Sequence, residues 1–142
     1  MEESSDGKNI MPKIFNREDE PSMDLETVTK WCLEKRGAWE DRPFGPEPAV
    51  MKVASKMFAI VAGGNPVHLS LKCDPDTATM LRQEFEAVKP GYHLNKTHWN
   101  TVALDGTVPE KDVRWMIDHS YALVAKSLTK REREREGLEA NA

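Results

Sequence analysis

The chain has 142 residues, of which 39% are hydrophobic and 31% charged, and its formal net charge is −4. This profile is typical of one globular domain with a hydrophobic core, and the acidic total argues against a general nucleic-acid binder. No apolar run approaches the roughly 18 residues of a membrane span, and the polar N-terminus does not resemble a secretory signal. The two cysteines lack CxxC spacing, so we expect neither a disulfide framework nor a structural zinc site. They indicate a reducing compartment.

The charge is distributed unevenly along the chain. Residues 1–26 contain three basic and eight acidic residues, which gives −5, and −4 minus −5 leaves +1 for the remainder. The total charge therefore says little about any local patch. Residues 1–22 also lack regular apolar spacing, so we expect a flexible acidic segment, in which Ile10, Ile14 and Phe15 are able to dock on the domain.

The first half of the domain reads as one helix and then a series of strands. Ser22 or Asp24 caps the first helix, and Gly37 suits the left-handed residue that closes it. Strands are expected at residues 38–42, 50–54, 57–62 and 67–72. The last of these alternates between apolar and polar residues, which predicts one buried and one wet face in an antiparallel sheet.

The second half adds two helices and one strand. Asp74 and Pro75 open a helix whose apolar stripe extends to Val88, and residues 89–91 end it. A strand is expected at 99–105. Residues 107–110, Thr-Val-Pro-Glu, fit a capping box for the last helix, which the charged run 130–136 is expected to prolong.

This order of elements predicts the fold class. Antiparallel hairpins with helices over one face make a two-layer α+β sandwich. We expect a domain at residues 23–130, between the acidic segment 1–22 and a charged C-terminal tail at 131–142. A monomer is expected.

Two segments carry a resemblance to a known family. The sequence Ala-Trp-Glu-Asp-Arg-Pro-Phe-Gly-Pro-Glu occupies residues 38–47, and Lys-Pro-Gly-Tyr-His-Leu-Asn-Lys-Thr-His-Trp occupies 89–99. Together with the order of the strands between them, these motifs resemble the MmcQ/YjbR family across roughly residues 23–128. The resemblance implies a fold similar to the bacterial frataxin-like (CyaY-like) sandwich and DNA binding by analogy with double-wing proteins, and it implies no catalytic residues.

The wet face of the sheet is the first candidate site. Its lysines are suited to phosphates and its aromatic residue to stacking on an unpaired base. An ordinary solvated sheet face is the alternative. The candidate residues of this face and its hairpin tips are Lys52, Lys56, His68 and Lys72, with Ser70, Trp99 and Thr101 nearby.

The loop before the last strand is the second candidate. It offers donors for a phosphate or carboxylate, or else its polar groups bind loop carbonyls while Tyr92 and Trp99 seal the core. Its candidate ligand-binding residues are His93, Asn95, Lys96, His98 and Trp99.

Other chemistry has less support. His93 and His98 fit no standard zinc spacing, so neither a metal nor a cofactor is expected. His68 and Ser70 do not make a catalytic triad. Phe44 beside Gly45 indicates a tight turn in which the aromatic ring fills the core, and a ligand clamp is the alternative.

These observations lead to one functional expectation and one alternative. We expect a non-enzymatic, cytoplasmic protein that binds DNA through phosphate contacts of the sheet face and the His93–Trp99 loop. The acidic N-terminal segment would compete for that face. The alternative is a protein-interaction module or a module that binds a small anionic ligand.

Overall fold

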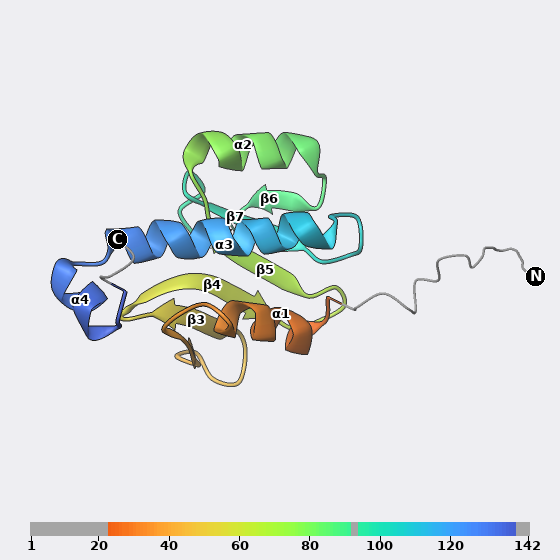
Figure 1. Cartoon of the computed structure of the whole chain (residues 1–142). Coiled ribbons are helices and arrows are strands. Elements are labelled where there is room, and N and C mark those ends of the chain that lie inside the picture. Colours follow the sequence, from red (N-terminus) through yellow and green to blue (C-terminus); the bar gives the residue numbers. More distant parts are fainter. Residues whose placement is uncertain (1–22, 92–93, 139–142) are drawn as a thin grey trace, which may run out of the picture.

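The computed structural model describes residues 23–91 and 94–138. Its centre is a six-stranded antiparallel sheet in the order β2-β3-β4-β5-β7-β6, with the helices packed beside it (Figure 1). The strands are β2 (Ala38–Asp41), β3 (Ala49–Val53), β4 (Lys56–Ala62), β5 (His68–Lys72), β6 (Val88–Pro90) and β7 (Trp99–Ala103). The helices are α1 (Leu25–Leu33), α2 (Pro75–Glu84), α3 (Glu110–Ser127) and α4 (Lys130–Arg135).

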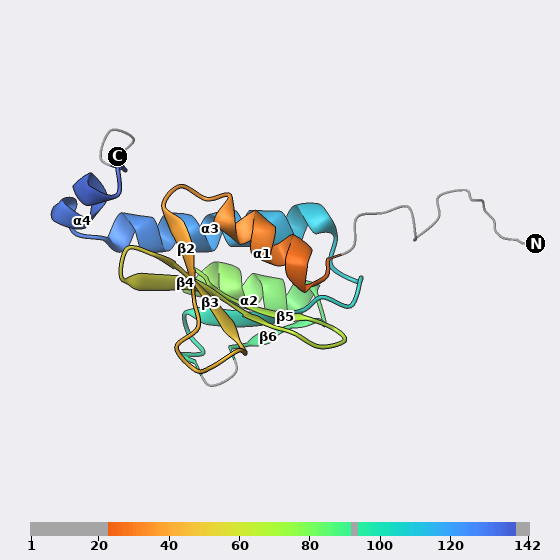
Figure 2. The same cartoon turned by 90° about the horizontal axis from the view of Figure 1, so that it is seen from below.

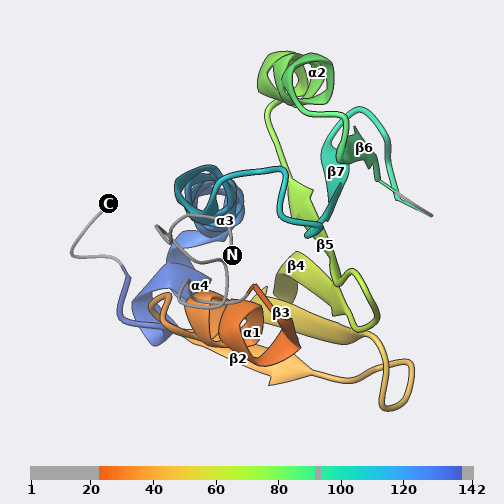
Figure 3. The same ribbon diagram turned by 90° about the vertical axis from the view of Figure 1, so that its right-hand side faces the viewer.

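Helices α1, α2 and α3 lie on one face of this sheet, and Figure 3 shows the two layers edge-on. The α+β sandwich expected from the sequence is therefore confirmed. Apolar residues of α1 and α3 meet those strand residues that point toward the helices, because strand side chains alternate between the two faces. The most deeply buried members of this core include Val28, Met51, Phe58, Leu69, Val102, Val113 and Ile117.

Local sequence explains where two of the helices begin. The Asp24 carboxylate accepts a 2.9 Å hydrogen bond from the Thr27 amide and caps α1. Asp74 caps α2 in the same way, and Pro75 occupies the first helical position. Gly37, after α1, adopts a φ of +76°, so the left-handed residue expected there is confirmed.

The expected extension of α2 to Val88 is wrong. The helix ends at Glu84, and Phe85 is already extended. Val88 pairs with Val102 and belongs to the short edge strand β6. Val88 lies at helical spacing, but Pro90 disfavours helical backbone at the residue before it and is tolerated at a sheet edge.

The expected capping box at residues 107–110 is also wrong. Among the described residues no side chain caps α3, and the Thr107 hydroxyl instead donates 2.6 Å to the Asp105 carboxylate. That short-range bond competes with the cap. A capping box does form between Thr129 and Glu132, and Leu128 before it is extended. The charged run therefore forms the separate helix α4 instead of prolonging α3.

Candidate functional site

The sheet face opposite α1, α2 and α3, here called the open face, carries a row of paired side chains. Ile60 pairs with Ser70, Ser70 with Thr101, and Thr101 with Lys89, so these four residues cross four strands. The hydroxyls of Ser70 and Thr101 are 2.7 Å apart and share a hydrogen bond. The floor of the open face is therefore apolar at Ile60 and polar at its centre.

A groove with a volume of about 1310 Å³ extends over this face. Its floor comes from β4, β5 and β7, and its sides come from the β2–β3 loop and from the segment around β6. Its apolar lining consists of Phe44, Pro48, Ile60, Ala62, Phe85, Ala87, Pro90, Leu94 and Ala103. Its polar and charged lining consists of His68, Ser70, Glu84, Glu86, Lys89, Thr101, Asp105 and Thr107.

The β2–β3 loop forms a braced side of the groove. The Arg42 guanidinium bonds both the Glu40 carboxylate and the Pro46 carbonyl. The Glu47 carboxylate accepts a 2.8 Å hydrogen bond from the Gly63 amide at the β4–β5 turn. The loop holds Phe44 with 72% of its surface exposed. The expectation that this ring fills the core is wrong, because Phe44 lines the groove instead.

Arg82 on α2 braces the opposite side. Its Nε donates 2.6 Å to the side-chain oxygen of Asn100, and its guanidinium also bonds the Lys96 and Trp99 carbonyls. The Asn100 amide in turn donates to the carbonyl of Ala78. Because Asn100 is buried, these bonds fix the loop before β7 against α2.

Of the three candidate lysines of the sheet face and its hairpin tips, Lys52 and Lys72 share the open face, and Lys56 contacts the end of α3. Lys52 projects on the open face, but its ammonium lies 2.8 Å from the Asp41 carboxylate and 5.4 Å from the centre of the Trp39 ring. Lys56 donates to the Ser127 hydroxyl and carbonyl at the end of α3. Lys72 lies on the open face by alternation, outside the lining of the groove.

His68 alone among the nine candidate residues lines the groove within the described part of the chain. Its Nδ1 is 3.1 Å from the Pro66 carbonyl, whereas the Ser70 hydroxyl bonds Thr101. These contacts leave His68 and Ser70 without the mutual hydrogen bond of a nucleophile and its base.

The candidate loop residues mainly hold the loop together. The Asn95 side chain accepts from the Thr97 amide, and the Lys96 ammonium donates to the Gly91 carbonyl. His98 is exposed, while Trp99 is buried at 8% exposure. His93 lies outside the described residues.

The sequence patterns did not lead us to predict the apolar groove, although one of them indicates it. Residues 57–62 form a continuous apolar run instead of an alternating one. A strand that is apolar on both faces is covered on both or presents one apolar face to a ligand. Ile60 and Ala62 are the members of that run that line the groove.

Several titratable groups have pKa values shifted by their surroundings. Burial raises the pKa of Cys32 to about 12 and that of Cys73 to about 11, so both are thiols at neutral pH. Hydrogen bonds from Thr107 lower the pKa of Asp105, which lines the groove as a carboxylate. Across residues 23–91 and 94–138 no three His, Cys, Asp or Glu side chains gather as a metal site, and no helix is long and apolar enough to cross a membrane.

Fold and groove together define a class of protein, a one-sided α+β sandwich with a largely apolar groove on its open face. This chain belongs to the YjbR family, whose family model matches residues 33–123. It is 34% identical to YjbR of Escherichia coli K12 over 112 residues, which cover 78% of this chain and 95% of that protein. It is 37% identical to YbdF of E. coli O157:H7 over 111 residues, which cover 78% and 91%. Both relatives are named as uncharacterised proteins.

Solved structures support the same assignment. A crystal structure of the Deinococcus radiodurans protein DR2400 superposes with a TM-score of 0.78 at 40% identity, covering 84% of this chain and 91% of that one. A crystal structure of a Pseudomonas syringae protein superposes with a TM-score of 0.63 at 26% identity, covering 72% and 99%. Family membership expected from the two sequence motifs is therefore confirmed.

Proposed function

We propose that this protein is a binding protein whose groove on the open face receives an apolar peptide segment of a partner protein. The observation that carries this proposal is the groove itself. Its volume of about 1310 Å³ exceeds the roughly 300–1,000 Å³ of most small-molecule sites. Its length across β4, β5 and β7 suits a segment that lays several side chains on one surface.

The lining of the groove favours an apolar ligand with a basic flank. Phe44 offers an exposed aromatic ring, and Ile60 and Leu94 add aliphatic surface. Among the described residues of the lining, three are acidic, namely Glu84, Glu86 and Asp105, whereas Lys89 is the one lysine or arginine. Opposite charges at the rim of an interface select partners and speed their association.

DNA binding is the second candidate, and it has less support. A DNA-binding surface needs unengaged basic groups near the phosphates. Lys52 and Lys56 already have partners within the domain, and the acidic residues at the groove repel phosphate. The same acids disfavour a small anion. DNA binding therefore stays a prediction that the resemblance suggests.

A nuclear magnetic resonance (NMR) titration of the labelled full chain separates these candidates. The probes are a 16-residue amphipathic Leu/Lys peptide, a Leu/Glu peptide of equal length and a 12-base-pair DNA duplex. We expect the Leu/Lys peptide to shift the signals of Ile60, Thr101 and Ala103 most strongly. DNA shifts at those residues, or Leu/Lys shifts confined to the helices, would overturn the proposal.

Two variants with matched chemistry test the specificity of that titration. Phe44 is 72% exposed beside the groove, and Met80 is 62% exposed on α2. Phe44→Ala should weaken Leu/Lys peptide binding at least threefold, while Met80→Ala should leave it unchanged. Equal effects of the two substitutions would indicate general hydrophobic adhesion instead of a site.

A further inference from the structure

Residues 8–17, Lys-Asn-Ile-Met-Pro-Lys-Ile-Phe-Asn-Arg, have a composition that the groove favours. Four large apolar side chains alternate with three basic ones, and no acidic residue interrupts them. Acidic residues stand on both sides, at 2, 3 and 6 and at 18–20. The acidic N-terminal segment therefore contains one apolar, basic stretch of ten residues, here called the basic stretch.

The acidic residues of the groove come from two neighbouring segments of the chain, which together are here called its acidic corner. The Ala103 amide donates 3.0 Å to the Ala87 carbonyl, which places Glu86 beside the chain that leads to Asp105. Glu84 precedes them at the end of α2. None of the ion pairs found within the described ranges involves these three carboxylates. The corner is therefore able to attract a basic group.

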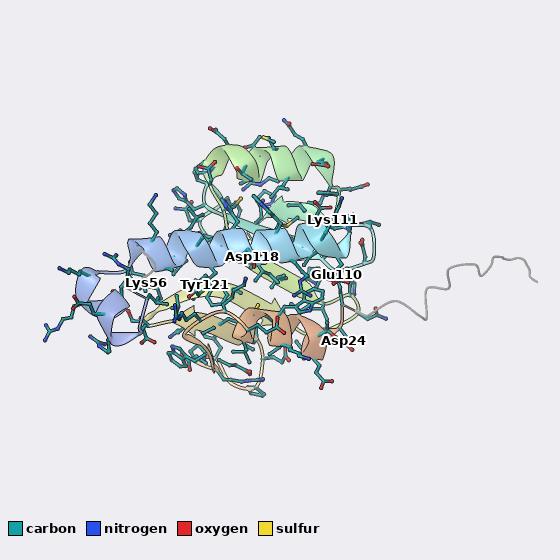
Figure 4. All side chains as sticks on the ribbon, in the orientation of Figure 1. Asp24, Lys56, Glu110, Lys111, Asp118 and Tyr121 are labelled. Carbon is teal, nitrogen blue, oxygen red and sulfur yellow. The ribbon has the colours of Figure 1, made fainter. Side chains whose placement is uncertain are left out.

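The basic stretch is tethered close to this corner. Asp24, which Figure 4 labels at the start of α1, lies at the same end of the molecule as the β4–β5 turn and the connection from β7 to α3. Figure 2 shows the same neighbourhood from below. Asp105 and Thr107 belong to that connection, and Ala62 and His68 flank the turn. The six residue steps from Arg17 to Met23 span up to about 20 Å when extended.

We infer that the basic stretch of the chain occupies its own groove, with Ile14 and Phe15 on the apolar part of the floor at Ile60 and its basic residues toward the acidic corner. This inference rests on the groove of the proposed function and adds its regulation, because a partner segment must displace residues 8–17 to bind. It differs from the hypothesis that the acidic residues of the N-terminal segment cover a basic face, which stays a prediction. Under the present inference those acids flank the docked stretch, and the lining of the groove contains the acidic residues Glu84, Glu86 and Asp105.

A spin label on the basic stretch tests the inference with the full chain and no added partner. Cys32 and Cys73 are buried and react slowly, so Asn16→Cys offers the thiol that a nitroxide labels. We expect the label to broaden the methyl signals of Ile60, Ala62 and Ala103 to less than half their intensity. The methyl signal of Met80, on the outside of α2, should keep more than four fifths of its intensity.

Control variants separate docking from random encounters. Ile14→Ser with Phe15→Ser removes the apolar contacts, and Glu84→Lys with Glu86→Lys reverses the corner charge. Each pair should restore the methyl intensities. Broadening that is uniform over the surface, or unchanged in both pairs, would overturn the inference.

A mixed sample distinguishes a second copy of the chain as the occupant. Spin-labelled unenriched protein is added to isotope-labelled protein without the label, and we expect no broadening of the Ile60 and Ala103 methyl signals. Broadening in this sample would overturn docking within one chain. Because no peptide is added, a failed Leu/Lys titration would count against the proposed function alone.

Discussion

Ser120, fully buried on α3, donates a 2.6 Å hydrogen bond to the carbonyl of Phe58 on β4. The same hydroxyl accepts a 2.9 Å bond from the Lys72 amide. The pairing of β4 with β5 ends at Ala59 and Leu71. The pairing of β3 with β4 skips Phe58. The Ser120 side chain therefore bonds two backbone groups at this bulge, where the hydrogen-bond ladder between the strands is interrupted. It also joins the helix layer to the sheet.

Replacing Ser120 by Ala should destabilise the protein markedly. The substitution leaves a buried carbonyl and a buried amide without their partner, which costs about 1–3 kcal/mol. Urea unfolding followed by tryptophan fluorescence measures this loss. Thr79→Ala is the control, because the exposed Thr79 hydroxyl only bonds the Pro75 carbonyl of its own helix. A loss for Ser120→Ala no greater than that of the control would contradict the role of the hydroxyl.

Arg82→Met should loosen the loop before β7, which forms one side of the groove. The variant keeps an apolar stem but removes the donors to Asn100, Lys96 and Trp99. A buried Asn100 that loses this charged partner costs about 1.5–3 kcal/mol. Hydrogen exchange should become faster at the amides of residues 94–99 than elsewhere.

The exposed neighbour Gln83 provides the comparison for Arg82. Gln83→Met places the same side chain on the same helix without touching the loop, and we expect stability within about 0.5 kcal/mol of the parent. If Arg82→Met changed exchange equally throughout the sheet, the bonds would stabilise the domain in general instead of this loop in particular.

Sequence patterns predicted most of the architecture because they reflect local physics. Alternation at residues 67–72 and the turn signal at 63–66 describe a hairpin whose two faces differ. Asp24 and Asp74 cap their helices through bonds that involve only residues three positions away. Such signals depend on neighbouring residues and not on the tertiary structure of the rest of the chain.

The groove and its surroundings depend on contacts that are distant in sequence. Lys52 and Lys56 looked like phosphate ligands, but their partners Asp41 and Ser127 lie 11 and 71 positions away. The exposure of Phe44 depends on how Glu47 ties its loop to Gly63. A strand face that looked polar from β5 alone becomes part of a mixed surface once the apolar Ile60 of β4 lies beside Ser70.

Helix α4 should lose stability in acid. Hydrogen bonding from the Thr129 amide, followed by bonding from Ser55, lowers the pKa of Glu132 below its ordinary value of 4.5. Its ionised form therefore stabilises the folded helix above the ordinary value, and this contribution is lost as the pH falls through the lowered pKa. Amide shifts of Thr129 and residues 130–135, followed from pH 7 to pH 2, measure the loss.

Glu132→Gln tests that assignment. The amide side chain still accepts a hydrogen bond but does not titrate, so the α4 shifts of this variant should stay nearly constant where those of the parent move. A common midpoint in both proteins would assign the acid response to another group, such as Asp41 or Asp105, whose pKa values are also lowered.

Both cysteines should resist thiol reagents until the protein unfolds. With a pKa of about 11 for Cys73 and about 12 for Cys32, only on the order of one thiol in a thousand or fewer is a thiolate at pH 8. The thiolate is the nucleophile, so a disulfide-exchange dye should react over hours with native protein and within seconds in urea. Cys73 should react first, because it is 4% exposed and Cys32 is fully buried. Cys73→Ser and Cys32→Ser identify the two phases, and a fast native phase that persists in Cys73→Ser would contradict the burial of Cys32.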